Sequence, residues 1–140
     1  MRDQHCHTIY SPDASKESTF EAYIKSAEKK GLSHLTFTDH VDYEANAKIF
    51  DQIPDFTAFK NALQTVQKNT NVKLQMGVEL GYQPHVLDRM NALVKAHDFG
   101  LVILSVHYVK GLDPYDGSLF KGRSLVDAFA KHDWDTMCEK

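Results

Sequence analysis

The sequence predicts an α/β fold in which parallel strands alternate with helices. Short apolar runs alternate along the chain with amphipathic runs of helical spacing, four times in succession. This alternation is typical of a parallel sheet with helices outside it, either an open doubly wound sheet or part of a barrel. Each of the four strands delivers a His or Glu side chain at its C-terminal end, which favours a barrel, where strand ends converge on one point.

The first strand is expected at about residues 4–10, followed by a helix. Ser18 and Glu21 have the spacing of a capping box, and Gly31 can supply the left-handed residue that ends a helix near Lys30. The apolar face of this helix consists of Phe20, Tyr23, Ile24 and Ala27. The second strand is expected at residues 34–38.

Asp55 introduces the second helix, and the third strand is expected at residues 73–80. Pro84 begins the third helix, and Gly100 separates that helix from the fourth strand at 101–106. Ser124 opens a fourth helix that runs to about Met137, after a loop at 111–122. The buried stripe of the second helix is expected to be Phe56, Phe59, Leu63 and Val66, and that of the third Leu87, Met90, Leu93 and Val94.

The composition is that of one globular domain over residues 1–140, with 42% hydrophobic and 25% charged residues. A formal net charge of −3 without a basic run indicates no nucleic-acid partner. Only two cysteines are present, which fits a reducing, cytoplasmic compartment. The chain starts with polar residues and its longest apolar run is too short to span a bilayer, so a soluble protein without a membrane partner is expected.

Candidate metal ligands end the predicted strands. His5 and His7 alternate along the first strand, so both imidazoles face one way and can chelate one ion, while Cys6 faces the other way as a small core residue. The alternative is two unrelated strand histidines. Glu79 lies in an otherwise apolar strand, where an inward carboxylate is costly unless a cation meets it, so it is expected to bind metal and to bridge two ions.

Three further residues are candidates from their positions. His40 closes the second strand as a ligand, with Asp39 orienting a neighbouring group; the alternative is a helix-capping aspartate beside a loop histidine. His107 ends the most apolar strand, and its alternative is a hydrogen bond to a backbone carbonyl. Asp13 lies in a turn after the first strand, where a further ligand would be found. Four histidines are excluded, because they lie at the far strand end or on outer helices: His34, His85, His97 and His132.

The ordered combination of these motifs resembles the PHP phosphoesterases, the polymerase and histidinol phosphatase superfamily. The resemblance rests on HCH at 5–7 with Asp13, TDH at 38–40, GVELG at 77–81 and SVH at 105–107. Three segments are similar to the stand-alone histidinol-phosphatase branch: YSPD at 10–13, FTDHVDY at 37–43, and HYVKG at 107–111 followed by DPY at 113–115. The resemblance implies that the four βα units are the N-terminal part of a distorted (β/α)7 barrel.

The resemblance also implies a site for up to three divalent ions, most simply zinc, with iron or manganese as alternatives. Carried over by motif, His5, His7 and Glu79 would hold one ion, Glu79 and His107 a second, and Asp13 with His40 a third. The implied activity is phosphomonoester hydrolysis by metal-bound hydroxide, so that no side chain acts as nucleophile. The implied substrate is L-histidinol phosphate, in histidine biosynthesis.

Complete members of the family are longer and supply a further histidine and a late Asp-x-His pair, which are not found after Trp134. We therefore expect residues 1–140 to be a PHP-type metallophosphoesterase domain that is truncated at its C-terminus, with each ion short of one ligand. Three alternatives stay open: a metal-dependent hydrolase of the amidohydrolase type, a PHP module that serves a polymerase, and an inactive truncated fragment. The sequence predicts no oligomeric state.

Overall fold

The computed structural model describes residues 1–44 and 53–108. The chain divides into two compact units, Met1–Ser105 and Val106–Lys140, and all the helices and strands given below belong to the first. The predicted helix at 124–137 and the predicted loop at 111–122 lie outside the described residues. Among the helices of the described part, none is long and apolar enough to cross a membrane.

The strands of the first unit form one parallel sheet. β1 (Arg2–Cys6) pairs with β2 (His34–Phe37), and β2 pairs with the first half of β4 (Lys73–Gly81). β3 (His40–Val41) follows β2 after two residues and pairs with the second half of β4, whose other edge pairs with β5 (Leu101–Ser105).

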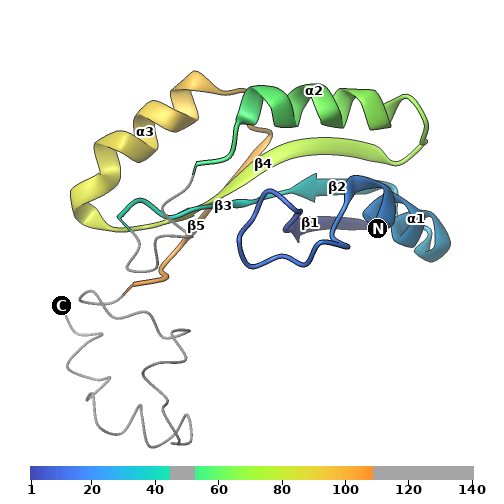
Figure 1. Ribbon diagram of the computed structural model, residues 1–140, viewed down its shortest axis with the longest axis horizontal. Helices are drawn as coiled ribbons and strands as arrows, with labels where there is room; N and C mark the ends of the chain where they lie inside the picture. Colours follow the sequence, from blue (N-terminus) through green and yellow to red (C-terminus); the bar gives the residue numbers. More distant parts are fainter. Residues whose placement is uncertain (45–52, 109–140) are drawn as a thin grey trace, which may run out of the picture. The chain divides into compact units, whose positions relative to one another are not determined.

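The neighbours in this sheet follow the order of the chain once β2 and β3 are taken as one interrupted strand (Figure 1). Chain order is the arrangement of a barrel, whereas a doubly wound sheet reverses its order at a switch point. The predicted fold class, α/β with parallel strands that form part of a barrel, is confirmed.

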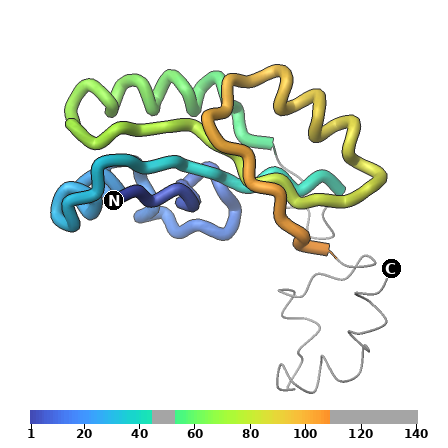
Figure 2. The backbone as a smooth tube through the Cα atoms, turned by 180° about the vertical axis from the view of Figure 1, so that it is seen from behind, coloured from blue at the N-terminus to red at the C-terminus, as the bar shows by residue number. Residues whose placement is uncertain are grey.

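The helices lie outside the sheet. α1 (Phe20–Lys30) packs beside β2, and α2 (Phe56–Gln67) packs on β4. A 3₁₀ turn, η1 (Pro84–Val86), leads into α3 (Leu87–Ala96). Figures 1 and 2 show α2 and α3 along the same side of β4, which we call its outer face; the opposite side is its inner face.

Several predicted boundaries are confirmed by local chemistry, and others are wrong. Gly31 has the left-handed φ of 68° after α1, and the Asp55 side chain accepts two backbone N–H groups at the start of α2. The cap of α1 is Thr19 and not Ser18, because the Thr19 hydroxyl accepts the Ala22 N–H. Leu87 was expected to face inward but is 43% exposed, because the 3₁₀ turn at Pro84 delays the start of α3.

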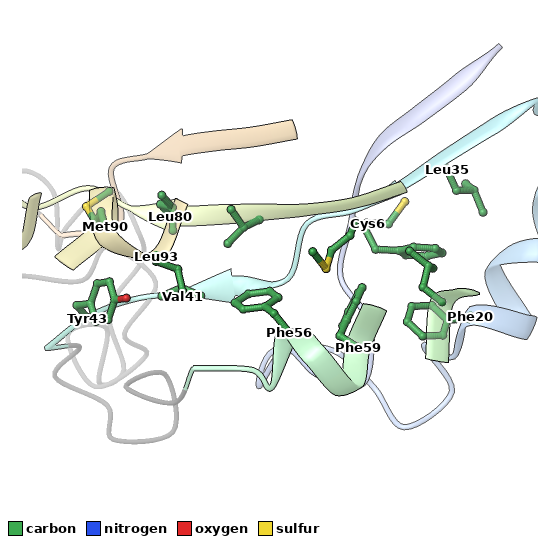
Figure 3. Close-up of a cluster of buried hydrophobic side chains, with 14 of the residues drawn as sticks. Cys6, Phe20, Leu35, Val41, Tyr43, Phe56, Phe59, Leu80, Met90 and Leu93 are labelled. Carbon is green, nitrogen blue, oxygen red and sulfur yellow. The ribbon is translucent and has the colours of Figure 1, made fainter. Parts of the chain in front are cut away.

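The hydrophobic core lies between the outer face of the sheet and the helices, as Figure 3 shows. Aromatic rings fill its centre: the ring of Phe20 lies 4.9 Å from that of Phe37 and 5.1 Å from that of Phe59, both in edge-to-face geometry. β4 contributes its outward residues Met76, Val78 and Leu80 to this core, since alternate residues of a strand share a face. The intervening residues of β4, Glu79 among them, are left for the inner face.

Candidate metal centre

A β-bulge in β1 sets the direction of the two N-terminal histidines. Asp3 is paired with Leu35 and Cys6 with Phe37, so β1 uses one residue more than β2 over this stretch. Asp3 and Cys6 can therefore both lie on the outer side, and His5 and His7 both face inward. Burial, the charge of Asp3 and a hydrogen bond to Asp3 raise the pKa of Cys6 to about 12, which fits a protonated core residue.

β1 itself ends at Cys6, so the predicted strand at 4–10 is too long. The chain turns immediately afterwards, where the Ser11 N–H donates to the Thr8 carbonyl at 2.8 Å. His7 thus lies just past the strand, and its backbone carbonyl accepts the Tyr23 hydroxyl at 2.8 Å. This contact with α1 holds the His7 backbone in place beyond the sheet.

Glu79 is the point on which the histidines converge. Its Oε2 atom lies 2.8 Å from His5 Nε2 and 2.9 Å from His7 Nε2. Its Oε1 atom accepts the Ser105 hydroxyl of β5 at 2.6 Å. The residue is only 4% exposed, so this carboxylate is buried, and it is directed at imidazoles at the end of β1, which is separated from β4 in the sheet by β2.

Asp13 and His40 lie on the other side of His7. Asp13 Oδ2 is 2.8 Å from His7 Nδ1 and 3.6 Å from His40 Nε2. His40 is paired in register with Glu79, and its Nε2 atom is 3.7 Å from Glu79 Oε2. The structure therefore brings together five of the six predicted ligands within the first unit.

The arrangement of these atoms fits a metal. Within the first unit, two sets of three ligand atoms each lie within 4.8 Å of one another: His5, His7 and Glu79, and His7, Asp13 and His40. In a tetrahedral zinc site with bonds of about 2.0–2.1 Å, neighbouring ligand atoms are about 3.3 Å apart. The distances of 2.8 Å to 3.7 Å around Glu79 bracket that value. The donor set, imidazole and carboxylate, is one that zinc, iron and manganese use.

The carboxylates of Glu79 and Asp13 raise the pKa of His7 when no metal is bound. Burial lowers the pKa of His7, but hydrogen bonds to Glu79 and Asp13 and the charges of both carboxylates outweigh it and raise the pKa to about 9. Burial raises the pKa of Asp13, but the hydrogen bond to His7 and the charges of His7 and His40 outweigh it. The pKa of Asp13 is therefore below its ordinary value. These carboxylates therefore favour the protonated form of His7 at neutral pH, and a metal bound there would have to displace that proton.

Asp39 lies among the site residues without joining either ligand set. It is fully buried, and its carboxylate accepts both the backbone N–H and the hydroxyl of Thr8. Burial raises the pKa of Asp39, and the hydrogen bonds from Thr8 oppose the rise. Asp39 was expected to orient a neighbouring group, and the group that it contacts is Thr8, the residue after His7.

The remaining histidines lie elsewhere. His34 opens β2, His85 lies in η1 where its Nε2 atom is 3.2 Å from Glu44 Oε2, and His97 follows α3. His132 is outside the described residues. His107 comes just after β5 in the second unit, which is described separately from the first, so its part as a ligand stays a prediction.

Sequence reasoning missed several residues that support the ligands. Thr8, Ser11 and Ser105 each donate to or accept from a ligand-bearing segment, and Asp42 Oδ2 lies 3.2 Å from His40 Nδ1. Asp42 could have been found from its spacing, because it is two residues after His40. The hydroxyl residues carry no such signal, since their partners are far away along the chain.

The family model of the PHP domain matches residues 3–138. The chain belongs to the PHP domain family. Curated PHP relatives include the histidinol-phosphatase of Lactococcus lactis subsp. lactis, 29% identical over 119 residues, a match that covers 84% of this chain and 43% of the relative. A probable histidinol-phosphatase of Clostridium acetobutylicum is 27% identical over 130 residues, which cover 91% of this chain and 47% of the relative.

This PHP domain also has a solved structural neighbour. The crystal structure of histidinol phosphate phosphatase from Lactococcus lactis, complexed with zinc, L-histidinol and phosphate, superimposes with a TM-score of 0.77 at 22% identity. The match covers 93% of this chain and 49% of that one. The two proteins share a fold, and the chain spans about half the length of the relatives it matches.

Proposed function

We propose that this PHP domain serves the metal-dependent hydrolysis of a phosphomonoester, L-histidinol phosphate, in histidine biosynthesis. The convergence of His5 and His7 on the buried Glu79 carries the proposal, because a buried carboxylate ringed by imidazoles is a poor hydrophobic core and a good metal site. The substrate is supported by the names of the relatives and by the L-histidinol and phosphate in the Lactococcus lactis crystal structure. A cytoplasmic location is supported by the low cysteine content.

Zinc is the proposed metal, with up to three ions, and iron or manganese suits the same donors. His5, His7 and Glu79 would hold the first ion, and Asp13 with His40 the second, beside His7. Zinc is favoured by its presence in the Lactococcus lactis structure. His107 is proposed as a further ligand on its sequence motif alone.

The ions, when bound, would lower the pKa of water to about 7 and neutralise charge on the phosphate. The chain's own residues orient the ligands and set their protonation states. Ser105 donates to Glu79 Oε1, which fixes the carboxylate and leaves Oε2 directed at the histidines. Imidazoles bind metal in the neutral form, so His7 must release the proton that Glu79 and Asp13 stabilise. Metal loading should therefore release protons.

The proposal is tested by metal content and turnover on the same sample of the purified 140-residue chain. Zinc is counted by plasma mass spectrometry, and phosphate release from L-histidinol phosphate is followed. We expect His5→Asn and Glu79→Gln to lose zinc and activity together. His85→Asn is the matched control, because His85 is an exposed histidine outside both ligand sets, and it should retain both properties.

Each outcome separates one alternative. Hydrolysis of a cyclic amide without phosphate release would indicate the amidohydrolase alternative. Bound zinc without either activity would mean that the chain holds metal but needs a further segment or chain for turnover. A wild-type chain that binds no zinc contradicts the proposal, and normal zinc content in Glu79→Gln would mean that Glu79 is not a metal ligand.

A further inference from the structure

A buried group of hydrogen bonds joins the turn after β1 to the junction between β2 and β3. The Thr8 N–H donates to Asp39 Oδ1 at 2.6 Å, and the Thr8 hydroxyl lies 3.0 Å from each oxygen of the same carboxylate. Thr8 and Asp39 are both 0% exposed. Ser11 adds a second connection, because its Oγ atom accepts the His40 N–H at 2.9 Å. We call Thr8, Ser11 and Asp39 the turn lock.

The turn lock is held at both ends by the sheet. The Asp39 backbone carbonyl accepts the Glu79 N–H of β4 at 3.1 Å, and the Thr38 N–H donates to the Cys6 carbonyl of β1 at 2.8 Å. The segment that carries Asp39 and His40 is therefore fixed to β1 and β4. The turn that carries Asp13 is fixed in part through the lock.

Because Asp39 is buried, its carboxylate needs hydrogen-bond donors from the protein. A buried carboxylate keeps its charge only when donors surround it, and the donors to Asp39 come from Thr8. Separation of the turn from the β2–β3 junction would leave this carboxylate buried without them. The lock therefore has one favourable geometry, and that geometry fixes where the turn lies.

The two ligand sets depend on the lock to different degrees. Asp13 is on the locked turn and His40 has its N–H bound by Ser11, so the second set is held through the lock. His5 lies in β1 and Glu79 in β4, where the sheet ladder and Ser105 fix them. His7 belongs to both sets, and its backbone is also held by Tyr23.

We propose that the turn lock sets the affinity of the ion bound by Asp13 and His40, without touching that ion, and affects the ion of His5 and Glu79 much less. Thr8, Ser11 and Asp39 are thus positioning residues for one ion of the pair. The inference rests on the proposed metal site. It predicts that substitutions can lower the affinity of one metal site without lowering the affinity of the adjacent site.

The test is a zinc titration of the full 140-residue chain by calorimetry, with metal content measured after dialysis. The wild type should bind two zinc ions or more in separable classes, and Asp13→Asn and His5→Asn identify the class that belongs to each ligand set. Thr8→Val and Ser11→Ala should lower the affinity of the Asp13 class by about 10-fold or more, as loss of groups that orient ligands typically does. Thr8→Ser keeps the hydroxyl and should behave as wild type.

Ser105→Ala is the reciprocal variant, because the Ser105 hydroxyl supports Glu79 and makes no contact with the lock. It should weaken the His5 class and spare the Asp13 class. Thermal melting in EDTA establishes that each variant is folded. If Thr8→Val fails to fold, the zinc affinities of Ser11→Ala test the inference. Ser11→Ala should fold, because it leaves the donors from Thr8 to the buried Asp39 in place.

Unchanged zinc affinities in both Thr8→Val and Ser11→Ala would overturn the inference while leaving the metal site intact. Equal weakening of both classes in these variants would also overturn it, because that result indicates a general loss of structure. A wild-type chain that binds only one zinc ion would overturn the inference, because one of the two ligand sets would then hold no ion. A wild type without zinc would overturn the proposed function together with the inference.

Discussion

The outer and inner faces of β4 show how one strand serves two purposes. Val78 and Glu79 are adjacent and both almost fully buried, yet Val78 packs in the hydrophobic core and Glu79 meets imidazoles. Burial of apolar area stabilises the fold by about 25 cal/mol per Å², whereas burial of a carboxylate costs free energy that its partners must offset. Stability and metal binding should therefore separate by face, and substitutions on each can test this.

The largest effect on stability is expected on the outer side, at Phe59. Its ring is fully buried against Phe20, so Phe59→Ala should lower the free energy of unfolding by about 3–5 kcal/mol through lost burial and a cavity. Urea unfolding in EDTA measures this. The neighbouring Lys60→Ala, at an exposed position, should change it by about 0.5 kcal/mol or less. A loss below about 1 kcal/mol for Phe59→Ala would contradict the core described above.

The adjacent pair gives the sharpest comparison. Glu79→Gln should lower zinc affinity by about 100-fold or more, because it removes a charged ligand shared by the histidines. Val78→Ala should lower the free energy of unfolding by about 2 kcal/mol and leave zinc affinity unchanged. A fall in zinc affinity in Val78→Ala as large as that in Glu79→Gln would refute the separation by face.

Gly77 tests how closely the inner face is packed. A Cβ atom there would lie 2.8 Å from Thr38 Cγ2, 2.9 Å from the Leu101 carbonyl oxygen and 3.0 Å from Thr36 Cγ2. Because the Leu101 contact is to backbone, Gly77→Ala should cost about 1–3 kcal/mol in urea unfolding. Gly100→Ala is the comparison, since its Cβ would meet the flexible side chain of Gln75, and a smaller cost is expected. Equal costs would mean that Gln75 cannot move.

The last test is the pH dependence of the metal-free chain. The pKa of His7 is raised from 6.5 to about 9, so the folded state binds a proton that the unfolded chain has lost. This contribution is fully present below pH 6.5 and is lost as the pH rises through 9. Melting temperatures in EDTA should therefore fall across this range, and less steeply in His7→Asn. A flat profile in the wild type would contradict the raised pKa.

Elements with local signals were predicted well from the sequence. The caps at Gly31 and Asp55 depend on backbone conformation and neighbouring N–H groups, so their chemistry is visible in a few residues. The inward face of β4 follows from period-two alternation in a strand without irregularity. The strand order follows once each strand is assigned, because consecutive βα units are neighbours in a barrel.

Features that depend on a distant partner were not predicted. The end of β1 at Cys6 is set by the turn and by pairing with β2, which lies about thirty residues on, and the strand at 4–10 was therefore placed too late and too long. The break between β2 and β3 is fixed by Asp39, whose partner Thr8 is 31 residues away. Thr19 and Ser18 are both good caps by type, and only geometry chooses between them.

The bulge in β1 has a consequence for how the length of this strand can vary. Because the extra residue between Asp3 and Cys6 is already accommodated outside the regular ladder, removal of Gln4 would leave His5 and His7 directed as they are. The same deletion within β4, which pairs regularly on both edges, would turn Glu79 to the opposite side. An alignment gap before the first histidine pair is therefore compatible with an unchanged site, whereas a gap in β4 is not.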